Sequence, residues 1–102
     1  MNEQRTESEY EGVGDEALME RTARGERDAF AELVRRHQNP LVNFFRRLGD
    51  STRAEDLAQE TFIRLYRYRK KYRASAKWTT FLYVLARRVR IDDLRKRTRR
   101  AD

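Results

Sequence analysis

The sequence has no cysteine, one histidine and one proline among its 102 residues. Without cysteine there is no disulfide, no thiol nucleophile and no cysteine-ligated zinc site, and a single histidine excludes a histidine-rich metal cluster. No apolar run approaches the roughly 18 residues of a membrane-spanning helix, and the polar N-terminus does not read as a secretory signal. We therefore expect a cytoplasmic protein with no membrane segment and no metal or organic cofactor.

Residues that could carry catalysis are equally sparse. A nucleophile needs a base beside it, and His37 is the one histidine available. The carboxylate pairs Asp92–Asp93 and Glu55–Asp56 are adjacent in sequence, so on a helix they point in different directions and do not converge on one substrate atom. Neither a dinucleotide-binding glycine motif nor a phosphate-binding loop is present. The sequence therefore predicts a protein that is not an enzyme.

Charge is abundant and unevenly distributed. Charged residues make up 40% of the chain, with 24 Lys and Arg against 17 Asp and Glu and a net charge of +7. Fifteen of the basic residues lie in residues 64–100, where Asp92 and Asp93 are the only acidic ones. Such a block attracts polyanions, of which nucleic acid is the commonest, although a solvated face that keeps the protein soluble is the alternative.

The chain is short enough for a single domain, and its pattern is helical. Residues 1–14 are polar and acidic, and we expect them to form a disordered tail. Residues 15–100 then form the domain, an all-α, compact four-helix bundle. The expected helices cover residues 15–24, 27–48, 52–71 and 78 to beyond 96.

Short-range signals set the expected helix ends. Asp15 is a candidate N-cap, and Thr52 with Glu55 forms a candidate capping box. Gly25 is placed to end the first helix, and Gly49 follows the last apolar residue of the second, as C-terminal capping glycines do. Within the second helix, Pro40 removes a backbone donor and predicts a kink, or a break with Asn39 as a new N-cap.

Aromatic and cationic side chains alternate in residues 72–100. Tyr72, Trp78, Phe81 and Tyr83 could stack on unpaired bases while the arginines contact phosphates, as binding to single-stranded or melting DNA requires. Trp78 and Phe81 also share a helical stripe with leucines, so a core position is an equal alternative for both. In residues 55–66, by contrast, an acidic and amide-bearing helix face suggests a basic partner or a solvated surface.

Three segments, in order, resemble the sigma-70 family of bacterial transcription factors. GERDAFAELVRRH at 25–37 is similar to the opening of region 2.1, DLAQETFIRLY at 56–66 to the core of region 2.2, and FLYVLARRVRIDDLRKRTR at 81–99 to regions 2.3 and 2.4. Regions 1.1 and 3 have no counterpart. The resemblance therefore indicates the extracytoplasmic function (ECF, group 4) sigma factors, and within them domain 2 (regions 1.2–2.4).

The resemblance implies two binding surfaces. Members of this family join core RNA polymerase through the coiled coil of the β′ clamp, which here implies a surface of Glu55, Asp56, Gln59, Glu60, Phe62 and Tyr66. They also recognise and help to melt the promoter −10 element and trap a flipped base of the non-template strand, with the loop of residues 73–78 shaping the pocket. The implied DNA-binding residues are Tyr72, Arg73, Lys77, Trp78, Thr80, Tyr83, Arg87, Arg88, Arg90 and Arg95. An anti-sigma factor is a further implied partner.

Several departures from the family pattern bear on these expectations. Arg88 stands where the family has asparagine, and an arginine there could read guanine edges or pair with phosphate. Domain 4, which reads the −35 element, has no counterpart, and we expect the chain to be a piece of a longer factor. Two other functions stay open: a sigma-like adaptor that binds polymerase without reading promoters, and a nonspecific basic helical DNA-binding protein.

Overall fold

The computed structural model describes residues 9–74 and 77–101. Helices dominate these residues, and no strand occurs among them. In chain order the elements are α2 (Asp15–Ala23), α3 (Arg27–Arg47), α4 (Ala54–Arg67), the short 3₁₀ helix η1 (Arg69–Lys71) and α5 (Trp78–Ala101). The predicted all-α, four-helix architecture is confirmed.

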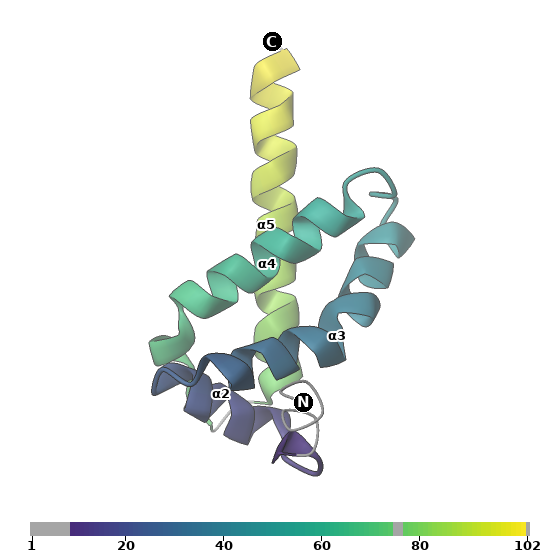
Figure 1. Ribbon diagram of the computed structural model, residues 1–102. Helices are drawn as coiled ribbons and strands as arrows, with labels where there is room; N and C mark the ends of the chain where they lie inside the picture. Colours follow the sequence, from purple (N-terminus) through teal and green to yellow (C-terminus); the bar gives the residue numbers. More distant parts are fainter. Residues whose placement is uncertain (1–8, 75–76, 102) are drawn as a thin grey trace.

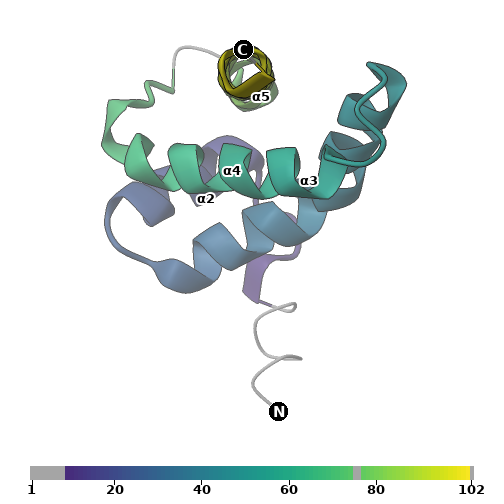
Figure 2. The same ribbon diagram turned by 90° about the horizontal axis from the view of Figure 1, so that it is seen from above.

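Helix α4 occupies the middle of the bundle. It lies between α3 on one side and α5 on the other, while α2 packs against α3 and the first turns of α5 (Figures 1 and 2). The C-terminal half of α5 extends beyond the other helices (Figure 1), which gives the molecule extents of 49 × 29 × 20 Å. The domain therefore has a packed body and one projecting helical arm.

The core is built from the apolar stripes of these helices. Each helix turns one face inward, because its apolar residues recur every three or four positions. The fully buried large side chains of this core include Leu18, Met19, Leu33, Leu41, Phe45, Leu65, Trp78, Leu82 and Val89.

Two glycines end helices as predicted. Gly25 (φ +100°) and Gly49 (φ +93°) adopt the left-handed conformation directly after α2 and α3. The amides of Gly49 and Asp50 donate to the carbonyls of Arg46 (3.0 Å) and Phe45 (3.1 Å), as in a Schellman cap. This cap turns the chain from α3 towards α4.

The predicted N-terminal caps are wrong. The N-cap of α2 is Gly14 and that of α4 is Arg53, and neither makes a side-chain capping bond. The Asp15 carboxylate instead pairs with His37 of α3, with 3.0 Å between Oδ2 and Nε2. Glu55 extends into solvent, so the expected reciprocal bonds with Thr52 do not form.

Proline is accommodated within α3 rather than ending it. The helix continues through Pro40 as one element of 21 residues, so the alternative of a break with Asn39 as a new N-cap is wrong. Figure 1 shows that α3 changes direction along its length, as the loss of one backbone hydrogen bond at a proline allows.

The expected disordered tail needs a correction over its second half. Residues 1–8 lie outside the described residues, but Tyr10 is 1% exposed and belongs to the core. Its hydroxyl donates to Glu26 (2.5 Å), and its carbonyl accepts from Arg36 (2.9 Å). Residues 9–14 are therefore part of the folded domain. In the described part of the chain, no helix has the length and apolar content needed to cross a membrane.

Candidate functional site

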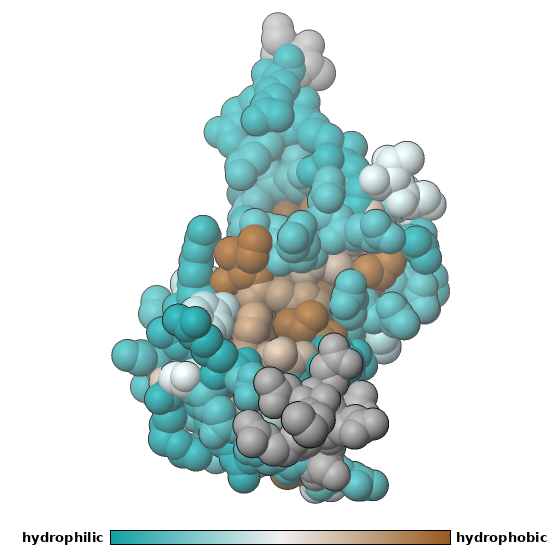
Figure 3. Space-filling model, viewed as in Figure 1, coloured by the Kyte–Doolittle hydropathy of each residue, from teal (hydrophilic) through white to brown (hydrophobic). Residues whose placement is uncertain are grey.

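A groove runs between α3 and α4 on one face of the molecule. Its volume is about 760 Å³, and five of the six residues predicted to bind polymerase line it. Figure 3 shows apolar side chains gathered at the centre of this face, with hydrophilic side chains around them. The five are Glu55, Asp56, Gln59, Phe62 and Tyr66.

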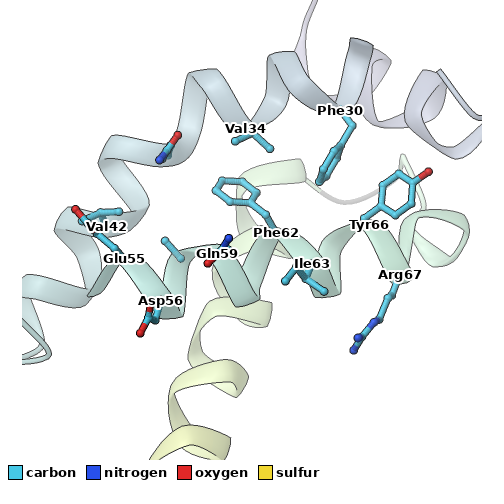
Figure 4. A pocket seen from close by; sticks show the side chains of 12 residues that line it. Phe30, Val34, Val42, Glu55, Asp56, Gln59, Phe62, Ile63, Tyr66 and Arg67 are labelled. Carbon is cyan, nitrogen blue, oxygen red and sulfur yellow. The ribbon is translucent and has the colours of Figure 1, made fainter. Parts of the chain in front are cut away.

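The helical repeat of α4 produces this arrangement. Leu57, Thr61 and Leu65 face the core. On an adjacent face of the same helix, Gln59, Phe62 and Tyr66 line the groove. Phe62 is 6% exposed and contributes to the floor, while Asp56 and Gln59 are exposed at the rim. The groove therefore combines an apolar floor with an acidic and amide-bearing edge (Figure 4).

Helix α3 contributes the opposite wall, which the sequence analysis did not assign to a site. Phe30 and Val34 point towards Phe62 and Tyr66 in Figure 4, and the rings of Phe30 and Tyr66 meet edge-on at 5.0 Å. Both α3 residues are partly exposed. The sequence shows that Phe30 and Val34 recur at helical spacing with the other apolar residues of α3. It does not show that part of each side chain stays exposed, because that depends on how α3 and α4 pack.

Glu60 does not share the groove with the other five residues. It turns towards α5 and accepts a hydrogen bond from Arg64 (3.1 Å), which also donates to Asp92 (2.7 Å). Its carboxylate therefore belongs to the contact between α4 and α5.

The first half of α5 presents a second, basic surface. Thr80, Tyr83 and Arg87 recur at helical spacing around a shallow hollow of about 380 Å³. Lys77, Arg88 and Arg95 are exposed nearby or farther along the helix. The Tyr83 ring packs edge-on against Phe44 at 5.0 Å, and partial burial raises the pKa of its hydroxyl. The ring is thus held in place while one side remains accessible.

Comparison with known proteins identifies the family of this chain. The sigma-70 region 2 family model matches residues 33–100, which include α4, most of α3 and all of α5 but its last residue. This chain belongs to the sigma-70 region 2 family.

Curated sigma factors support the ECF assignment. The chain is 37% identical over 75 residues to the ECF RNA polymerase sigma factor SigW of Bacillus subtilis, a match covering 72% of this chain. It is 36% identical over 76 residues, or 74% of this chain, to the ECF RNA polymerase sigma-E factor of Haemophilus influenzae. Each match covers 40% of the relative, so this region 2 domain spans less than half the length of either.

A solved structure shares the fold. An engineered region 2 of sigmaE, determined by NMR in complex with GTAAAA, matches with a TM-score of 0.80 and 32% identity. The match covers 86% of this chain and 93% of the other. The sigma region 2 fold expected from the resemblance is confirmed.

Two predicted stacking residues of this sigma region 2 domain are buried. Trp78 is 0% exposed and packs against the ring of His37, at 4.7 Å between centroids. Tyr72 is 8% exposed and packs against Phe81 at 5.3 Å. The expectation that these two rings offer free faces to bases is therefore wrong, because both fill the junction of α5 with the body of the domain.

Arg90 also differs from the expected exposed phosphate ligands, because it is half-buried and paired. The Arg90 guanidinium donates to Asp50 (2.6 Å) and to the carbonyl of Leu48 (3.2 Å), which ties α5 to the turn after α3. Arg73 is exposed, and it donates to the carbonyl of Lys70 at 3.1 Å. Arg90 is thus engaged within the protein.

The adjacent aspartates of α5 anchor α4. Asp92 pairs with Arg64, and Asp93 accepts two hydrogen bonds from Arg53 (2.8 and 2.6 Å). These arginine hydrogen bonds hold the pKa of each aspartate below its ordinary value. The two carboxylates point to different partners, and their role in this domain is structural.

Proposed function

We propose that this domain binds core RNA polymerase through the groove between α3 and α4 and promoter DNA through the exposed face of α5. It would thereby direct transcription initiation, a binding role rather than a catalytic one. The observation that carries the proposal is the separation of an acid-rimmed apolar groove from a basic helix face, in a chain of the sigma-70 region 2 family.

The groove suits a helical partner that is basic and partly apolar. An amphipathic helix can place apolar side chains on Phe62 and Val34 while its cations meet Asp56 and Glu55 at the edge. The coiled coil of the β′ clamp is the proposed partner. An anti-sigma factor that covered the same groove would block polymerase binding, and we retain it as a proposed competitor.

The α5 face suits single-stranded DNA. Tyr83 provides a ring for base stacking, and Lys77, Arg87, Arg88 and Arg95 provide exposed cations for phosphates. The structural neighbour was determined with the oligonucleotide GTAAAA, which supports the proposal that the non-template strand of the −10 element binds this face. Tyr72, Trp78 and Arg90 are left out of the proposed surface.

The chain would act as one part of a larger factor. Residues 15–100, extended at the N-terminal side by the packed residues around Tyr10, would form domain 2. A region that reads the −35 element would lie in the part of the relatives that this chain does not match. Because both proposed partners are cytoplasmic, we propose the same location for the protein.

Retention on immobilised core polymerase tests the first surface. We expect wild type to be retained and Asp56→Arg to be lost, because a cation at the rim would face a basic partner. Glu20→Arg makes the same charge change at an exposed position of α2 and should bind as wild type does. Equal retention of Asp56→Arg and wild type would contradict the proposed groove contact.

Fluorescence anisotropy with labelled GTAAAA tests the second surface. We expect single-stranded GTAAAA to bind more tightly than its duplex or a scrambled strand, and Arg87→Ala to weaken binding. Arg24→Ala, which removes an exposed arginine at the C-cap of α2, is the matched control. Polymerase binding without strand preference would favour the adaptor, and equal DNA binding without polymerase binding would favour a nonspecific DNA-binding protein.

A further inference from the structure

The first turn of α2 carries two acidic residues that reach different helices. The Asp15 carboxylate lies 3.0 Å from Nε2 of His37 on α3. The Glu16 carboxylate accepts a hydrogen bond of 3.0 Å from the backbone amide of Trp78, the first residue of α5. Glu16 and Trp78 are 62 positions apart in the sequence, so this contact exists only in the folded domain.

The amide of Trp78 is one of the donors that a helix leaves unpaired at its start. The first intrahelical bond of α5 runs from the amide of Phe81 to the carbonyl of Lys77, at 3.2 Å, and the amides before it need acceptors from elsewhere. A carboxylate in this position satisfies one donor and also interacts favourably with the positive end of the helix dipole. Glu16 thus acts as an N-terminal cap supplied by another helix.

The side chain of Trp78 is held by packing and not by its own polar atom. Its ring is buried against His37, which in turn pairs with Asp15. The indole Nε1 is buried and, in the part of the chain that the structure describes, has no hydrogen-bond partner. The hydrogen bond from its backbone amide to Glu16 is therefore the polar contact that fixes where α5 begins.

We propose that Glu16 is a positioning residue for the DNA-binding face: by capping α5 at Trp78 it sets the start of the helix and the placement of Lys77 and Thr80 beside it. The inference rests on the proposed function, because it concerns the same α5 face. Glu16 itself does not contact DNA. Loss of the Glu16 carboxylate would let the first turn of α5 fray. Binding a single strand would then require a larger free energy to order that turn.

The test compares Glu16→Ala and Glu16→Gln with Glu20→Ala, which removes an exposed carboxylate one turn farther along α2. Labelled GTAAAA measures DNA binding, and immobilised core polymerase measures the groove. Trp78 is the only tryptophan of the chain, so intrinsic fluorescence reports directly on the capped residue.

We expect Glu16→Ala to weaken GTAAAA binding about tenfold, as the loss of a helix cap allows, and to shift Trp78 emission to longer wavelength. Glu16→Gln should bind with intermediate affinity, because its amide oxygen still accepts a hydrogen bond but carries no charge. Polymerase retention should be unchanged in both variants, and Glu20→Ala should match wild type in all three measurements.

Other outcomes would overturn the inference. Wild-type affinity and emission for Glu16→Ala would show that the cap does not position α5. A parallel loss of GTAAAA binding, polymerase retention and helical circular dichroism would show that Glu16 merely stabilises the fold. Failure of wild type itself to bind GTAAAA would instead reject the proposed function, and the dependent inference with it.

Discussion

At the scale of single residues, Asp93 connects pH to stability. Its pKa is lowered by the hydrogen bonds from Arg53, whereas an unfolded aspartate titrates near pH ~3.9. The stabilising contribution is therefore complete above the unfolded pKa and is lost as the pH falls through the lower folded pKa. Stability should decline steeply only in acid.

Asp93→Asn tests this linkage. We expect it to lower the free energy of unfolding by about 1–2 kcal/mol at pH 7, because it weakens charged hydrogen bonds. In strong acid the wild-type carboxylate is protonated and the two proteins should converge. Urea unfolding at both pH values makes the measurement, with Glu11→Gln at an exposed carboxylate as the control; a constant difference across pH would contradict the linkage.

Trp78 gives a second prediction at this scale. Because the ring is fully buried, Trp78→Ala should cost about 3–5 kcal/mol of stability through the cavity it leaves. Trp78→Phe should cost less and remain folded for binding measurements. Thermal unfolding of these variants beside Thr80→Ala, an exposed neighbour, checks the expectation; unchanged stability with abolished DNA binding would restore the stacking role that the structure rejects.

At the scale of elements, the turn after α3 depends on a single glycine. Gly49 has φ +93°, and a Cβ placed there would meet nothing within 4 Å. The cost of Gly49→Ala is therefore conformational, about 1 kcal/mol, and Gly49→Asn should cost less because asparagine tolerates this conformation better. Chemical denaturation that finds Gly49→Ala neutral would contradict this account.

The sequence predicts an element's ends well where neighbouring residues determine them, and poorly where residues distant in sequence do. The ends of α2 and α3 follow from Gly25 and Gly49, because a glycine cap is a local signal. The N-terminal caps failed because Asp15 pairs with His37, a partner brought near only by folding. Tyr10 was missed for the same reason, since its acidic neighbours look like a tail.

The residues of the two proposed binding surfaces also differ in how well the sequence predicts their positions. Helical periodicity predicted that Asp56, Gln59 and Arg87 lie outside the core, and the structure shows all three exposed. The orientation of Glu60 follows from the pairing of Arg64 with Asp92, which no spacing rule reports. For Trp78, helical periodicity was equally consistent with a core and a surface position. The side chain is in the core because α5 packs against α2 and α3 at this residue.

At the scale of the whole molecule, ion pairing separates the arginines of α5 into two groups. Arg87→Ala and Arg88→Ala each remove an exposed charge, and each should reduce the salt dependence of single-strand binding by about 0.7 in slope. Arg90→Ala should leave that slope unchanged and instead lower stability, because Arg90 pairs with Asp50. Titrations at several salt concentrations measure the slopes, and equal slopes for all three variants would contradict the division.

The projecting arm of α5 has a consequence for handling the protein. Residues 95–100 are exposed, and a helical segment with few buried contacts opens at little cost. Its dense arginines and lysine are trypsin sites, so limited digestion should shorten this arm before it cuts the packed helices. Oligonucleotides that bind along the arm should slow the cleavage. The rate of digestion then reports which ligands contact the arm.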